Sequence, residues 1–133
     1  MTDQHINKFI KTFKFAAFNV DGLYQHVGCS RQSKLDDDHL KKSLSNHDIF
    51  FLLETHCGPD LNHDKIELDG FLFDRTWRVK PPGARKYSGG IAVGVKKHFI
   101  LSKAIEILPS LSKSPEIIWA KLKKSFFNLD NDL

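Results

Sequence analysis

The chain has 133 residues, of which 20 are Lys or Arg and 16 are Asp or Glu, so its formal net charge is +4. This length fits one ordinary domain, and 41% hydrophobic with 27% charged residues excludes wholesale disorder. Two cysteines, Cys29 and Cys57, are too few for a disulfide-rich secreted module. Residues 49–53 form the longest apolar run, far too short for a membrane span, and residues 1–8 lack a secretory signal. We therefore expect an intracellular protein without a membrane partner, in the nucleus or the cytoplasm.

The first part of the chain predicts a strand followed by a helix. Side chains alternate over residues 13–19, which predicts a strand that ends at the turn pair Asp21-Gly22. We expect a loop over residues 28–33. Residues 34–46 are predicted to be helical, because leucines share one face and the aspartates at 36–38 precede lysines, as the helix dipole favours.

The second part predicts further strands. Residues 48–54 are a short apolar run bounded by acids, typical of a strand buried on both faces. Residues 67–74 predict a weaker strand and residues 88–95 a strong one, and predicted strands at 99–108 and 116–122 complete the set. About six strands and one clear helix indicate an α/β (α+β) arrangement dominated by its sheets.

Residues 74–87 combine basic and aromatic side chains in one segment. Pro81-Pro82-Gly83 cannot continue a helix or a central strand, so we predict a loop. Such a loop can hold phosphates and stack bases, the alternative being a solvated loop that its charges keep soluble. The candidate nucleic-acid-binding residues are Arg75, Trp77, Arg78, Lys80, Arg85, Lys86 and Tyr87.

Two polar residues stand at the ends of predicted strands. Asn19 follows the alternating strand, and Glu54 closes the most apolar one. A carboxylate at a strand end beside a dry core is a rigid metal ligand, and with a carboxamide oxygen and water it suits Mg²⁺. The alternative is that Glu54 pairs with a surface lysine.

Three ordered segments carry a resemblance to a known family. They are Phe-Ala-Ala-Phe-Asn-Val-Asp-Gly-Leu at 15–23, Asp-Ile-Phe-Phe-Leu-Leu-Glu-Thr-His at 48–56 and Tyr-Ser-Gly-Gly-Ile-Ala-Val at 87–93. Together they resemble the opening of the endonuclease/exonuclease/phosphatase superfamily, most of all the endonuclease domains of LINE-type retrotransposons, and residues 117–122 fit the next strand. The resemblance implies a four-layer α/β/β/α sandwich that cleaves phosphodiester or phosphomonoester bonds with Mg²⁺. The likeness to retrotransposon endonucleases and the basic, aromatic loop favour DNA as the substrate over a lipid or inositol phosphate. The resemblance also implies that Asn19 and Glu54 hold or orient the metal as catalytic residues.

The resemblance ends before the family's later motifs. Members carry an Asp-x-Asn pair and a Ser-Asp-His motif that activate water and polarise the phosphate. This chain contains no Ser-Asp-His, and Asp130-Asn131-Asp132 lies in a polar tail. We therefore expect residues 1–12 to be an extension and 13–133 to be a partial domain without its C-terminal catalytic half, a truncated endonuclease-like domain with negligible hydrolysis alone. The alternatives are a non-catalytic nucleic-acid-binding remnant and a degenerate mobile-element fragment.

Two further expectations follow from the residues. Half of a sandwich exposes a sheet face and a strand edge, so we expect self-association or a completing polypeptide. A zinc site is the rival to magnesium, because His56, Cys57, His63 and Cys29 are suitable ligands, but no spacing places two of them on one element.

Overall fold

Strands dominate the part of the chain that this computed structural model describes, residues 12–108 and 116–127. The elements in chain order are β1 (Phe15–Asn19), β2 (Tyr24–Val27), β3 (Ser30–Ser33), the 3₁₀ helix η1 (Lys34–Asp36), α2 (Asp38–Ser45), β4 (Ile49–Leu53), β5 (Phe71–Arg75), β6 (Ile91–Lys96), α3 (Lys97–Leu101), β7 (Ile105–Ile107), β8 (Ala120–Leu122) and α4 (Lys124–Phe127). The predicted mixture of α and β structure, with strands in the majority, is confirmed. Among the described helices there is none with the length and apolar character needed to cross a membrane.

The central sheet has four strands in the order β1-β4-β6-β5. β1 runs parallel to β4, whereas β6 is antiparallel to both β4 and β5. Phe50 of β4 and Phe73 of β5 lie on one sheet face around Gly94 of β6, where an added Cβ would come within 2.6 and 2.8 Å of the two rings. Glycine at this position therefore lets two aromatic rings pack directly on the sheet backbone.

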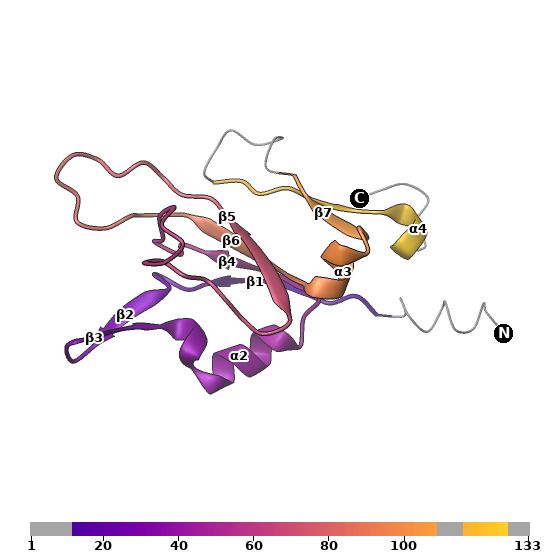
Figure 1. Ribbon diagram of the computed structural model, residues 1–133, viewed down its shortest axis with the longest axis horizontal. Coiled ribbons are helices and arrows are strands. Elements are labelled where there is room, and N and C mark those ends of the chain that lie inside the picture. Colours follow the sequence, from indigo (N-terminus) through magenta and orange to yellow (C-terminus); the bar gives the residue numbers. More distant parts are fainter. Residues whose placement is uncertain (1–11, 109–115, 128–133) are drawn as a thin grey trace.

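Different elements cover the two faces of this sheet, as Figure 1 shows with α2 on one side and β7 with α3 on the other. Leu44 of α2 belongs to the cluster around Phe50 and Leu52, and Leu40 packs against it. On the opposite face, Ile49, Val93 and Val95 form a second cluster with apolar residues of α3, β7 and β8. The hydrophobic core therefore has two parts, separated by the central sheet.

The predicted helix at 34–46 is confirmed as η1 followed by α2. Asp37 caps α2, because its carboxylate accepts a hydrogen bond from the Leu40 N–H at 2.9 Å. Asp38 lies in the first turn and Lys42 in the last, as the helix dipole favours. The three aspartates thus begin a helix, and none of them belongs to the one metal-binding group found in residues 12–108 and 116–127.

Two segments differ from the sequence prediction. The expected loop at 28–33 contains β3, which pairs with β2 as an antiparallel hairpin. Both strands are largely exposed and polar, so no hydrophobic alternation marks them. Residues 99–108 do not form the single expected strand: they contain the end of α3 and then β7. Lys103, between these two elements, has a left-handed φ of 63° that breaks an extended strand. The predicted extension at 1–12, apart from Thr12, and the Asp130-Asn131-Asp132 segment lie outside the described residues.

Candidate functional site

The carboxyl ends of β1 and β4 lie side by side, because these strands are parallel neighbours. Asn19 is the register partner of Leu53, so Glu54 follows directly at the same edge of the sheet. Beyond the strands, Val20 N–H donates to the Leu53 carbonyl at 3.0 Å and Gly22 N–H to the Glu54 carbonyl at 2.7 Å. The structure therefore brings Asn19 and Glu54, the two predicted catalytic residues, to one end of the sheet.

Asn19 acts on the turn that follows β1. Its side-chain Oδ1 accepts a hydrogen bond from the Asp21 N–H at 3.0 Å. This local bond holds the backbone of Asp21 two residues beyond the strand. Asn19 is thus a positioning residue for Asp21 in this structure.

Three side chains at this edge can hold one metal ion. The ligand atoms of Asp21, Glu54 and His56 all lie within 4.8 Å of one another. An ion holds oxygen ligands at about 2.0–2.6 Å, so two ligands of the same ion can be about 4–5 Å apart. Two carboxylates and one imidazole therefore fit a divalent cation in both chemistry and spacing.

The same three residues share an uncommon backbone conformation. Asp21, Glu54 and His56 have φ angles of 46°, 54° and 55°, in the left-handed region. A non-glycine residue there costs on the order of 1 kcal/mol and persists only where surrounding structure enforces it. The strain is concentrated where the three ligand atoms converge, which marks this edge of the sheet as a candidate site.

Hydrogen bonds on both sides enforce this conformation. Thr55 N–H donates to the Gly90 carbonyl at 3.1 Å and His56 N–H to the Gly89 carbonyl at 2.8 Å. From the other side, the Lys34 ammonium donates to the Val20 carbonyl at 2.6 Å and reaches the Asp21 carbonyl at 3.3 Å. The segments that carry the three ligands are therefore fixed by backbone contacts.

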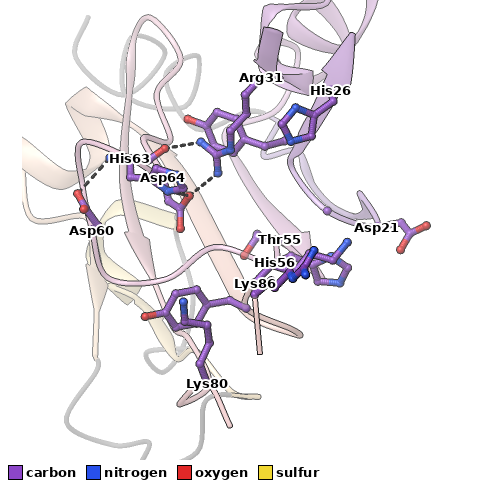
Figure 2. A pocket seen from close by; sticks show the side chains of 14 residues that line it. Asp21, His26, Arg31, Thr55, His56, Asp60, His63, Asp64, Lys80 and Lys86 are labelled. Atoms are coloured by element: carbon purple, nitrogen blue, oxygen red, sulfur yellow. Dashed lines mark hydrogen bonds and ion pairs between the residues drawn. The ribbon is translucent and has the colours of Figure 1, made fainter. Parts of the chain in front are cut away.

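A cavity of about 590 Å³ opens beside this cluster. Asp21 and His56 line it, together with the cationic side chains of Lys80, Arg85 and Lys86. Figure 2 shows it from close by; its lining residues are Asp21, Gly22, Tyr24, His26, Arg31, Thr55, His56, Asp60, His63, Asp64, Lys80, Arg85, Lys86 and Tyr87. Asp21 and His56 thus share this cavity with a basic wall formed by Lys80, Arg85 and Lys86.

Asp64 organises another part of the cavity, where Figure 2 shows Arg31 and His63 bonded to it. Its carboxylate is buried and accepts hydrogen bonds from Arg31 at 2.5 Å, from His63 Nδ1 at 2.8 Å and from the Gly58 N–H at 2.7 Å. Burial alone would raise the pKa of Asp64, but the bonds from Gly58, Arg31 and His63 outweigh it and lower the pKa. The Arg31 guanidinium also lies 3.8 Å from the centre of the Tyr24 ring.

The structure divides the predicted nucleic-acid-binding residues into two groups. Lys80, Arg85, Lys86 and Tyr87 line the cavity, and the Lys80 ammonium lies 4.9 Å from the centre of the Tyr87 ring. Arg75, Trp77 and Arg78 lie outside the lining.

Arg75, Trp77 and Arg78 have other surroundings. Arg75 belongs to β5 and donates to the carbonyls of Gly58 at 3.2 Å and Asp64 at 2.5 Å, so it holds the loop between β4 and β5. The Arg78 guanidinium pairs with Glu116 at 2.5 Å, and Trp77 is partly exposed to solvent.

The two cysteines do not join the metal-binding group that the described residues form. Cys29 is exposed between β2 and β3, whereas Cys57 is buried and its thiol donates to the Thr55 carbonyl. Burial raises the pKa of Cys57 to about 11, so its thiol stays protonated at neutral pH. The ligands expected for zinc are therefore not brought together.

Asp21 is the site residue that the sequence alone did not single out, and His56 was considered only as a ligand of the rival zinc site. Asp21 belongs to a turn pair and His56 follows the strand end, so each had an ordinary local explanation. The one available signal was the spacing of Glu54 and His56, two residues apart directly after a buried strand. Comparisons of the chain with protein-family models, with curated proteins and with solved structures each gave no match.

Proposed function

We propose that this chain binds the phosphodiester backbone of nucleic acid through a divalent cation held by Asp21, Glu54 and His56. The observation that carries the proposal is the convergence of these three ligands beside a cavity with a basic wall. Carboxylates alone would repel a phosphate, whereas a bound divalent cation cancels the two negative charges of Asp21 and Glu54. The lysines and arginine of the wall then supply further contacts to neighbouring phosphates.

The resemblance to nucleases of the endonuclease/exonuclease/phosphatase type supports the same proposal. We propose that the domain is the N-terminal part of a four-layer α/β/β/α sandwich, in which β7 and β8 begin the second sheet. When bound, the cation would neutralise charge on the phosphate oxygens. Asn19 would hold the turn that carries Asp21, and Glu54 would be a direct ligand. We expect this chain alone to bind a phosphodiester and to hydrolyse it negligibly.

The ligand set also bears on which cation is bound. The resemblance implies Mg²⁺, and the two carboxylates suit this ion. The imidazole of His56 suits Mn²⁺ or Zn²⁺ better, since nitrogen ligands favour these softer ions. We propose Mg²⁺ as the cation for DNA binding and expect Mn²⁺ to replace it.

Cation titration of the purified chain tests the metal site. We expect Glu54→Gln to raise the dissociation constant for Mn²⁺ at least about tenfold, because a charged ligand is lost. Glu67→Gln is the matched control: it removes the same charge from an exposed residue that pairs with Lys65 at 3.3 Å. Equal affinity of Glu54→Gln and the unchanged chain would refute the metal site.

DNA binding and cleavage test the function itself. Fluorescence anisotropy with a labelled DNA duplex should show binding that increases with Mg²⁺ and decreases with EDTA, and that Glu54→Gln abolishes. Binding that depends on salt but not on the cation would instead favour the non-catalytic remnant that uses its basic residues alone. Nicking of plasmid DNA that Glu54→Gln abolishes would contradict the expected absence of hydrolysis by this chain.

A further inference from the structure

We propose that β1 pairs with β1 of a second copy of this chain, antiparallel and with Ala17 on the two-fold axis. The paired edge belongs to the strand that leads to the cation site, but the pairing does not rest on the proposed function. β1 lies at the end of the central sheet opposite β5 (Figure 1). Within the described residues β1 has one strand partner, β4, so its other edge is open.

The pairing with β4 determines which backbone groups face this open edge. The Lys14 carbonyl and the Val20 N–H both bond to the β4 side. In a parallel ladder alternate residues direct both backbone groups to the same neighbour. Even-numbered residues of β1 therefore face β4, and the N–H and C=O groups of Phe15, Ala17 and Asn19 face outward.

Within its own residues β1 has no charge, proline or bulge of the kind that usually blocks edge-to-edge pairing. β1 reads Phe-Ala-Ala-Phe-Asn, without a charge or a proline, and its register with β4 has no bulge. Natural edges are normally protected by such features. Phe15 also leaves 70% of its surface exposed. An uncharged strand with an exposed aromatic ring is suited to pair with another strand.

The residue order of β1 selects a second copy as the partner. A closed dimer of this kind is isologous, so its edge strands run antiparallel about a two-fold axis. Outward-facing residues must then pair with outward-facing residues, which an axis at Ala17 satisfies by pairing Phe15 with the other copy's Asn19. The same register sets small Ala16 opposite large Phe18 on the other sheet face, so the side chains fit without two phenylalanines meeting directly. The strand is thus complementary to itself.

The dimer would place two cation sites at opposite ends of the shared interface. Asp21 lies four residues beyond Ala17, so the two sites would be roughly 26 Å apart along the strands at about 3.3 Å per residue. Each chain would keep its own complete ligand set, because Asp21, Glu54 and His56 all come from one copy. Dimerisation and cation binding can therefore be tested separately.

Sedimentation and light scattering over a concentration series test the interface. We expect a monomer–dimer equilibrium that Ala17→Pro weakens about tenfold or more, because the two hydrogen bonds that Ala17 donates and accepts across the axis are lost. The Ala17 N–H faces away from β4, so proline there spares the internal ladder and melting should still be cooperative. A chain that stays monomeric at every concentration, or Ala17→Pro that dimerises normally, would overturn the proposal.

A second pair of variants distinguishes an effect on dimerisation that is specific to the β1 edge from a general effect of added surface charge. Phe15→Lys adds a charge to the edge strand, whereas Leu101→Lys adds the same charge on α3, where the leucine is 75% exposed. We expect only Phe15→Lys to weaken the dimer, again about tenfold or more. Equal effects of the two lysines would refute the assignment to β1.

Cysteine cross-linking tests the register. In a Cys29→Ser background, which removes the exposed thiol, Ala17→Cys should form a disulfide-linked dimer on mild oxidation. Its Cα would be about 5.5 Å from its own copy, within disulfide range. Ala16→Cys should not, because it faces Phe18 of the other copy. Efficient cross-linking through Ala16→Cys instead would overturn the proposed register.

Discussion

Two clusters in this molecule use the same kinds of residue for different purposes. Asp21, Glu54 and His56 form one beside β1 and β4, and Asp64 with His63 and Arg31 forms the other in the loop between β4 and β5. The carboxylates of the first cluster accept no hydrogen bond from the described residues and are exposed. The carboxylate of Asp64 is buried and has three donors.

The contrast shows how satisfaction of hydrogen bonds separates a ligand site from a structural site. The Asp64 carboxylate already accepts hydrogen bonds from three donors, so it stabilises the loop between β4 and β5 that carries it. In the Asp21 cluster the ligand atoms lie within 4.8 Å of one another and their backbone is strained, so a cation that binds the folded chain would stabilise it.

Removing the Asp64 carboxylate should have the largest effect. We expect Asp64→Ala to lower the free energy of unfolding by about 2–4 kcal/mol, because Arg31 and the Gly58 N–H lose a buried acceptor. Urea unfolding of the purified variant measures this. Asp69→Ala, at an exposed position, should change stability by less than about 0.5 kcal/mol. Equal losses in the two variants would contradict the structural role of Asp64.

Low pH should remove the stabilisation that the Asp64 carboxylate provides. The pKa of Asp64 is lowered from its ordinary value of 3.8 in the folded chain, so the unfolded chain binds a proton first. The stabilisation is therefore present above about pH 3.8 and is lost as the pH falls below it through the folded pKa. We expect the difference in urea midpoint between the unchanged chain and Asp64→Asn to shrink below that pH. A difference in urea midpoint that stays constant between pH 7 and pH 2 would contradict the lowered pKa of Asp64.

Gly22 packs closely against the imidazole of His56 in the first cluster. Gly22 has a φ of 84°, and a Cβ there would lie 3.0 Å from His56 Nδ1. We expect Gly22→Ala to cost about 1–2 kcal/mol of unfolding free energy and to weaken cation binding, because the ring must move. Gly28→Ala is the matched control, with a φ of 64° and open space around it, and should leave cation affinity unchanged. Calorimetric cation titration distinguishes the two.

Much of the fold could be predicted where the hydrophobic pattern is strong. The apolar run at 49–53 and the leucine-bearing helix at 38–45 are confirmed, because each buries a regular face. The β2–β3 hairpin was missed since its side chains are mostly exposed and polar. Residues 99–101 are apolar in a run, which is compatible with a strand, but they form the end of α3.

Of the residues at the candidate site, only Asn19 and Glu54 could be predicted as site residues from the strand ends in the sequence. Asn19 ends β1 and Glu54 follows β4, and these strands proved to be parallel neighbours, so the meeting of the two residues could be expected from strand ends alone. Asp21 and His56 are aimed by left-handed backbone angles that distant partners impose, such as Gly89 and Lys34. No local pattern encodes such contacts, which arise only when the chain is folded.

The smallest predicted effect is an increase in the free energy of unfolding, whereas Asp64→Ala and Gly22→Ala are expected to lower it. Glu54 has a left-handed φ of 54°, which glycine adopts without strain, so Glu54→Gly should raise the free energy of unfolding by up to about 1 kcal/mol while abolishing cation binding. Glu67 has no such backbone angle, and Glu67→Gly should instead destabilise the chain by about 0.5–1 kcal/mol. Thermal unfolding without added metal compares them. If both variants lose stability equally, Glu54 is not strained, and the cluster would lose the property that sets it apart from Asp64.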